Sequence, residues 1–201
     1  MSTAFRRARG GGVSATFHVV EADLLSSLVG QLIDLVQDQP AQPRHHRGDP
    51  LDAVLDAFGT DDPSRPTDPV LLRLFPDAYR DDDEAAAEFR RYTERSLREQ
   101  KAGAAATMLA SLATAGDTGP QDSGRRGADK VKVHLDEDQA EAWLRTLTDL
   151  RLALGTRLGV DEEDTEHWQS LPEDDPQRHI HDVYDWLGFV QETLVRALFP
   201  T

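Results

Sequence analysis

The chain has 201 residues, with 37 acidic against 22 basic side chains, a formal net charge of −15 and no cysteine. This acidity opposes binding to nucleic acid and to anionic membranes, so we expect no direct contact with either. The lack of cysteine excludes disulfides, thiolate zinc sites, a cysteine nucleophile and a thiol redox switch within these residues. We find no signal-peptide pattern and no apolar run of membrane-spanning length, and we therefore expect one cytoplasmic domain, residues 1–201.

The N-terminal segment predicts a β-hairpin over residues 4–19. Two short stretches of alternating polarity, 4–9 and 13–19, flank three consecutive glycines that can adopt the positive φ angles of a tight turn. Further along, residues 130–135 also alternate in polarity. We expect this later segment to pair with the hairpin and complete a three-stranded antiparallel sheet.

Aspartate followed by proline occurs three times before a run that can be helical. The pair supplies an N-cap and a proline at the first helical position, where no backbone N–H is required. The three pairs predict helices over 50–58, 69–74 and 176–199. Between the predicted helices we expect a mobile loop at 116–129 and an exposed loop at 161–175, which contains eight acids.

Four longer segments carry apolar residues at helical spacing: 21–38, 83–114, 136–159 and 176–199. The second of them includes Gly103, a candidate position for a kink. Its predicted buried stripe consists of Ala86, Phe89, Thr93, Ser96, Gln100, Ala104, Met108 and Leu112. The pattern predicts an α+β fold, with a mainly helical core of four longer helices covered on one side by a small three-stranded antiparallel sheet.

One charged residue, Arg151, falls on the apolar side of the predicted helix 136–159. An unpaired guanidinium is costly to bury, so Arg151 must reach solvent or pair with a carboxylate from another element. Glu21 is the first candidate for this structural ion pair, because it begins a helix beside the hairpin. Asp185 is the second.

Two histidines, His179 and His181, lie two residues apart in the last predicted helix. Residues at this spacing point to different sides, whereas metal ligands on a helix are three or four residues apart. The sequence contains no glycine-rich phosphate loop between a strand and a helix and no serine-hydrolase motif. We therefore expect no metal, no cofactor and no catalytic residue, and predict that the protein is not an enzyme.

The densest basic group of the chain lies in the predicted helix 83–114 and includes Arg91, Arg95 and Arg98. Glutamates are interleaved with these arginines, which is typical of a solvated helix face with local ion pairs. The alternative is a candidate partner-binding surface for an acidic protein. Both readings place the three arginines on an exposed face.

The order of the parts and two segments of the sequence resemble an actinobacterial family of unknown function. The segments are Trp143-Leu144 with the run DLRLALG at 149–155, and the closing run DVYDWLGFVQETLV at 182–195. Members of this family are typically encoded beside the protease adaptor ClpS, and one is described as an oxidative stress regulator that senses oxidation through paired cysteines. This chain has no cysteine, so that sensing mechanism is not carried over.

The resemblance implies a transcription-linked regulatory protein that acts by protein–protein contact with RNA polymerase or a sigma factor. The alternative that it leaves open is an accessory protein of a ClpS-linked proteolysis or sulfur-transfer system. The quoted segments have the character of packing residues and include no catalytic motif.

Overall fold

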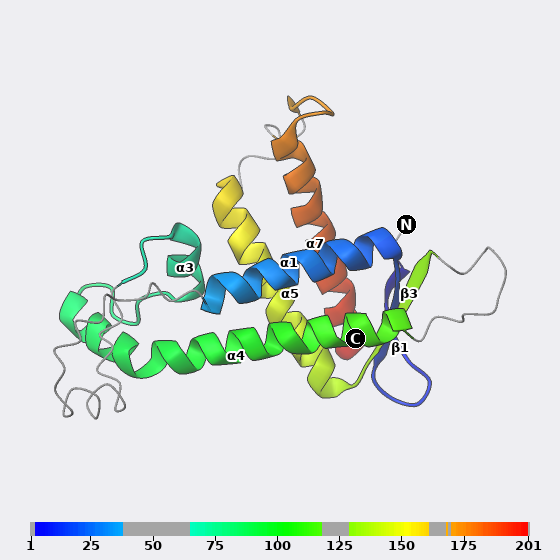
Figure 1. Ribbon diagram of the computed structural model, residues 1–201, viewed down its shortest axis with the longest axis horizontal. Helices are drawn as coiled ribbons and strands as arrows, with labels where there is room; N and C mark the ends of the chain where they lie inside the picture. Colours follow the sequence, from blue (N-terminus) through cyan, green and yellow to red (C-terminus); the bar gives the residue numbers. More distant parts are fainter. Residues whose placement is uncertain (1–2, 38–64, 118–128, 161–167, 169, 201) are drawn as a thin grey trace, which may run out of the picture.

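The computed structural model describes residues 3–37, 65–117, 129–160, 168 and 170–200. Its elements, in chain order, are β1 (Thr3–Arg7), β2 (Val13–His18), α1 (Val19–Gln37), α3 (Pro69–Leu74), α4 (Asp83–Asp117), β3 (Lys130–Leu135), α5 (Glu137–Leu158) and α7 (Pro176–Leu198). The fold is α+β, as predicted: a mainly helical body with one small sheet (Figure 1). The predicted helix 50–58 and most of the loops at 116–129 and 161–175 lie outside the described residues.

The sheet has the strand order β1-β2-β3, and both pairings are antiparallel. The predicted pairing of residues 130–135 with the hairpin is confirmed, in a register that runs from Val13 opposite Leu135 to His18 opposite Lys130. Gly12 in the hairpin turn has a φ of 71°, and a Cβ built on it would lie 2.2 Å from the carbonyl oxygen of Leu135. Any side chain at this position would collide with the neighbouring strand.

Helices α1 and α4 lie side by side along the long axis of the molecule, and α5 and α7 run across them (Figure 1). Trp143 of α5 is fully buried where the helices meet the sheet. Its ring lies 5.5 Å from that of Phe5 and 5.9 Å from that of Phe17, and its Nε1 donates a 2.7 Å hydrogen bond to Ser111 Oγ on α4. One residue of α5 thereby joins β1, β2 and α4.

The ends of the described helices follow the predicted capping residues. Asp68 and Asp175 accept hydrogen bonds at the first turns of α3 and α7, so the predicted starts at 69 and 176 are confirmed. Asp136 and Gln139 form a reciprocal capping box at the start of α5, and Gly159 ends that helix in the left-handed conformation with a φ of 65°. In the part of the chain that the structure describes, no helix is long and apolar enough to cross a membrane.

Helix α4 is continuous from Asp83 to Asp117, and Gly103 does not divide it. The predicted buried stripe is correct in the second half of α4, at Met108 and Leu112, but wrong in the first half, where Phe89, Ser96 and Gln100 are exposed. Ala86 is buried as predicted, but the other residues buried there are Arg90, Glu94 and Arg98. Three charged side chains therefore occupy the seam in which we expected small and apolar ones.

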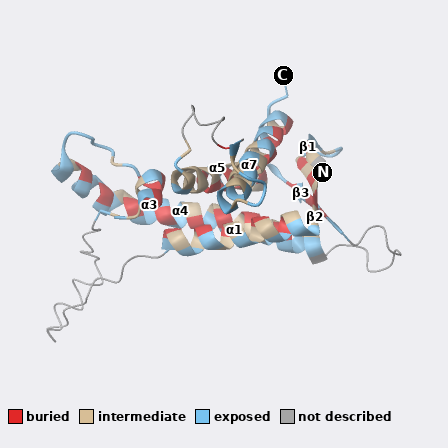
Figure 2. Cartoon of the chain, turned by 90° about the horizontal axis from the view of Figure 1, so that it is seen from above, coloured by how far each residue is buried: buried red, intermediate tan, exposed pale blue. Residues whose placement is uncertain are grey.

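The distal ends of α5 and α7 project beyond the main core (Figure 1), and Figure 2 shows how burial varies along the chain. Residues 151–158 of α5 and 176–186 of α7 include no fully buried residue, although the rest of each helix is well buried. The predicted core spacing of α7 therefore holds at Leu187, Val190 and Leu194, but Ile180 is exposed. The two distal ends contact each other, and the end of α5 also contacts Asp68 at the start of α3.

Candidate functional site

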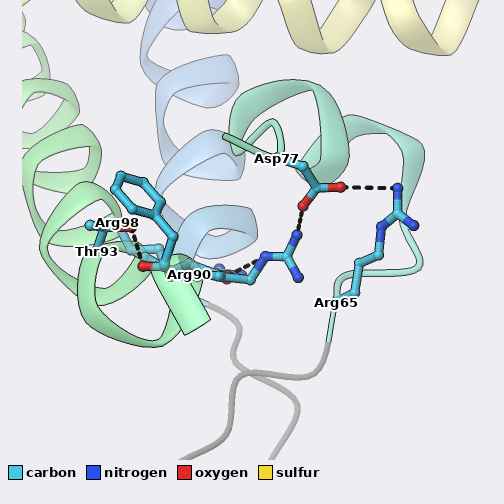
Figure 3. Close-up of polar contacts among 7 residues, drawn as sticks. Arg65, Asp77, Arg90, Thr93 and Arg98 are labelled. Carbon is cyan, nitrogen blue, oxygen red and sulfur yellow. Dashed lines mark hydrogen bonds and ion pairs between the residues drawn. The ribbon is translucent and has the colours of Figure 1, made fainter. Parts of the chain in front are cut away.

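A chain of ion pairs fixes the first half of α4 to the residues that precede it (Figure 3). Asp77 bridges Arg65, at 3.1 Å, and Arg90. Glu94 in turn contacts Arg90 at 3.4 Å and Arg98 at 2.6 Å. We call these five residues the ion-pair network; all but Arg65 have side chains less than a fifth exposed.

Arg98 links the network to α1. Its Nη1 donates a 2.7 Å hydrogen bond to the carbonyl oxygen of Val36 in the last turn of α1. A positive charge at this end of a helix interacts favourably with the helix dipole. Its guanidinium also stacks 4.7 Å from the ring of Phe75. The Arg98 side chain thus contacts α1, α4 and the segment that follows α3.

The expectation that Arg98 belongs to an exposed partner-binding face is therefore wrong, because Arg98 is only 6% exposed. Arg91 and Arg95 are exposed as predicted: Arg91 stacks on Tyr92, and Arg95 pairs with Glu99 at 3.2 Å. No contact of the described residues tests whether these two bind a partner. The sequence signal for the network was available in the alternating charges at positions 90, 94 and 98, which share one helix face.

A second, partly buried ion pair crosses between α4 and α5. Lys101 Nζ lies 2.7 Å from Oδ1 of Asp149, and Asp149 is 6% exposed. Sequence reasoning missed this pair. Asp149 lies between Leu147 and Leu150 on the apolar side of α5, so its burial was indicated, but its partner depends on how α4 crosses α5.

Arg151 lies in the junction between α5 and α7, and it does not form the predicted ion pair with Glu21. Its Nη1 donates a 2.9 Å hydrogen bond to Oε1 of Gln191, and its guanidinium lies 5.0 Å from the ring of Tyr184. Glu21 instead accepts a 2.7 Å hydrogen bond from the backbone N–H of His18. The physical reason is that Arg151 projects toward α7, whereas Glu21 caps the start of α1.

Asp185, the second candidate partner of Arg151, does not pair with it either. Its carboxylate lies 3.6 Å from the ring of His181, one turn earlier on α7. In the ranges that the structure describes, no ion pair includes Arg151, and its buried Nε has no hydrogen-bond acceptor. Arg151 is therefore a half-buried cation with neutral partners and an unused donor.

Two glycines shape this α5–α7 junction. A Cβ built on Gly188 would lie 3.5 Å from Cζ of Arg151, and one built on Gly155 would lie 3.4 Å from Cε2 of Tyr184. Both distances are those of ordinary van der Waals contact, so Arg151 packs beside Gly188 and Tyr184 beside Gly155. Gly155 and Gly188 fall within the two segments that carried the family resemblance, so those segments build the junction.

The junction continues as a stack of rings towards the projecting end. His181 stacks on Trp168 with a centroid distance of 4.8 Å and an interplanar angle of 18°, and it lies 6.1 Å from Tyr184. Trp168 is buried, so the expectation that the whole acidic segment 161–175 stays exposed is wrong at this residue. The sequence signal for this burial was a single large apolar residue, Trp168, within an acidic segment. It packs the segment against His181 of α7.

The two histidines considered for metal binding have separate roles. His181 belongs to the ring stack, and Nδ1 of His179 lies 2.9 Å from the carbonyl oxygen of Asp175. Among the residues with described positions, no group of three or more histidine, aspartate or glutamate side chains is arranged to hold a metal ion. The chemical capability that this part of the molecule offers is recognition of a carboxylate by Arg151.

The distal half of α5 is also tied to α3 by an ion pair. Arg157 Nη2 lies 2.6 Å from Oδ2 of Asp68, the residue that caps α3. Burial raises the pKa of Asp68, but the hydrogen bonds from the Val70 backbone and from Arg157 outweigh it, so the pKa lies below its ordinary value. Asp68 is therefore held as the carboxylate that both contacts require.

Comparisons with known proteins identify the family of this chain. The chain is 34% identical over 196 residues to the putative oxidative stress regulator AosR of Mycobacterium leprae, covering 90% of this chain and 80% of that protein. It is 35% identical over 193 residues to the oxidative stress regulator AosR of Mycobacterium tuberculosis, covering 89% and 78%. No solved structure matches it. Residues 2–198 match the model of the family described as Domain of unknown function (DUF2017), and the chain belongs to that family.

Proposed function

We propose that this protein is a regulatory protein of the oxidative stress response that acts by binding a protein partner of the transcription machinery, RNA polymerase or a sigma factor. The class of function is supported by its relatives, which are named oxidative stress regulators and are similar over about nine tenths of this chain. With no cysteine, the chain does not sense oxidants through thiols of its own. In this proposal the signal reaches it through the partner.

The observation that carries the proposal is the unneutralised guanidinium of Arg151 at the α5–α7 junction. A half-buried cation without a carboxylate is unfavourable, and an acidic side chain supplied by a partner would relieve that cost. Arg151 and the glycines that face it and Tyr184, Gly188 and Gly155, are half-buried, so the junction is not closed to a partner. The proposed contact is therefore a carboxylate of the partner placed against Arg151.

Affinity capture from cells that express the tagged full-length chain tests the identity of the partner. We expect RNA polymerase subunits or a sigma factor to be recovered with the unchanged protein and to be lost with Arg151→Met, which keeps the volume of the side chain but removes its charge. The matched control is Arg145→Met, which removes an exposed arginine of the same helix that is paired with Glu141. Recovery of ClpS or sulfur-carrier components in place of polymerase would favour the accessory-protein alternative and contradict the proposal.

A further inference from the structure

One face of α4 is exposed and uncharged over most of the length of the helix. Successive positions on this face follow helical spacing, and none of them is charged, in a chain with 29% charged residues. The face comprises Phe89, Tyr92, Ser96, Gln100, Gly103, Thr107, Ala110 and Thr114, all exposed or half-buried. We call it the uncharged face of α4; at 1.5 Å per residue it is about 38 Å long.

The uncharged face has a protruding half and a hollow half. Phe89 is 45% exposed and Tyr92 is 69% exposed, which is unusual for large aromatic side chains. At the other end, Thr107, Ala110 and Ser111 of α4, with Lys132 and His134 of β3 and Gln139 of α5, line an open cavity of about 350 Å³. Because 18 residues make five helical turns, Phe89 and Thr107 lie on the same line along the helix.

We propose that the uncharged face of α4 is the contact surface between two copies of this chain, paired as antiparallel helices around a two-fold axis close to Gln100. A two-fold contact uses the same patch on both copies, so that residue i meets residue j and residue j meets residue i. An axis near Gln100 brings Phe89 of each copy opposite the Ala110–Ser111 cavity of the other. The protruding half and the hollow half are then complementary on both sides of the axis.

Charge favours this face for a contact between two copies. Two chains of net charge −15 repel each other, so they approach most readily through a surface without acids. The charged residues beside the uncharged face near the axis are balanced, because Arg95 pairs with Glu99 at 3.2 Å. The small residues between Gly103 and Thr114 permit a short distance between the two helix axes.

The length of the contact fits a specific dimer. A helix face about 38 Å long and roughly 10 Å wide, with two aromatic side chains inserted at each end, offers on the order of 700 Å² of accessible surface per copy. This is close to the area of a standard protein–protein interface, about 800 Å² per partner. We therefore expect a reversible dimer with the aromatic residues as its anchors.

Single cysteines introduced into the chain test this geometry. The natural sequence has no cysteine, so no other thiol can form a competing disulfide. Gln100→Cys should form a disulfide-linked dimer rapidly on mild oxidation, since the two copies of this position lie beside the axis. The matched control is Gln31→Cys, on the exposed side of α1, which should react at least tenfold more slowly at the same concentration. Phe89→Cys alone should also react slowly, because its two copies lie about 33 Å apart, whereas mixing it with Ala110→Cys should restore fast crosslinking.

Sedimentation of the unmodified protein gives an independent result. The mass should rise from that of a monomer to that of a dimer with concentration, and Ala110→Glu, which places an acid of each copy in the contact, should weaken association at least tenfold. Ala87→Glu, which adds the same charge at an exposed position on the other side of α4, should leave it unchanged. A monomer at all concentrations, or equal crosslinking of Gln100→Cys and Gln31→Cys, would overturn the proposal.

Discussion

Two arginines one turn apart on α4 differ in burial, and their replacement should reveal what the ion-pair network contributes to stability. Arg95 has an 83% exposed side chain and pairs with the exposed Glu99. Arg98 has a 7% exposed side chain and pairs with the equally buried Glu94. Each arginine forms its pair with a glutamate four residues away, so the comparison contrasts a buried pair, with the further contacts of Arg98, against an exposed one.

Arg98→Met should lower the free energy of unfolding by about 3 kcal/mol, at the lower end of the range for breaking a buried pair, because Glu94 keeps a second contact with Arg90. The carbonyl oxygen of Val36 also loses its donor. Arg95→Met should cost no more than about 0.5 kcal/mol, as is usual for an exposed pair. The expected difference between the two variants is roughly 2.5 kcal/mol, from the same two ranges.

Urea unfolding followed by far-ultraviolet circular dichroism measures both variants, provided that the dependence of the free energy on urea concentration is unchanged. Replacing Glu94 with Gln should be at least as damaging as Arg98→Met, because it leaves Arg90 and Arg98 without the carboxylate between them. Equal and small effects of the replacements at 95 and 98 would refute the reasoning. So would a Glu94→Gln protein as stable as the unchanged chain.

Two further replacements test separate contacts, and one treatment tests for a metal site. Ser111→Ala should lower the free energy of unfolding by about 1–3 kcal/mol, because it leaves Nε1 of the buried Trp143 without its acceptor; a neutral effect in urea unfolding would contradict this. Asp68 has a lowered pKa in the folded state, so its contribution is complete above about pH 5 and is lost as the pH falls through that lowered pKa. Asp68→Asn, which can still cap α3, should therefore lose less stability on acidification than the unchanged chain, and an identical acid dependence would argue against the Arg157 contact. A chelator or Zn²⁺ should leave the melting temperature unchanged, and a clear shift with either would show that a metal site exists.

The positions of the helices and strands follow from the sequence because each has a local cause. Asp68 and Asp175 precede proline at helix starts, and alternation along residues 130–135 identifies the third strand. Periodicity also shows which residues share a face. Choosing the buried face required the assumption that it carries fewer charges than the exposed face. In the first half of α4 this assumption fails, because Glu94 pairs with two buried arginines, Arg90 and Arg98.

The partners of buried charges were less accessible to sequence reasoning. Whether Arg151 meets Glu21, Asp185 or Gln191 depends on the direction in which α5 crosses its neighbours, which no local pattern encodes. The same holds for Lys101 and Asp149, which are 48 residues apart. Gly155 and Gly188 of the α5–α7 junction lie in the segments that carried the family resemblance, but the sequence did not predict the junction or the geometry of Arg151 within it.

The most direct test of the proposed function is the binding of the purified full-length protein to purified RNA polymerase, with and without a sigma factor, measured at two salt concentrations. We expect saturable binding that weakens with salt and becomes at least tenfold weaker with Arg151→Met, since removing one member of a buried charge contact costs about 2 kcal/mol or more. Arg145→Met should bind like the unchanged protein. No binding to either form of the polymerase, or equal binding by the Arg151→Met and Arg145→Met proteins, would contradict the account.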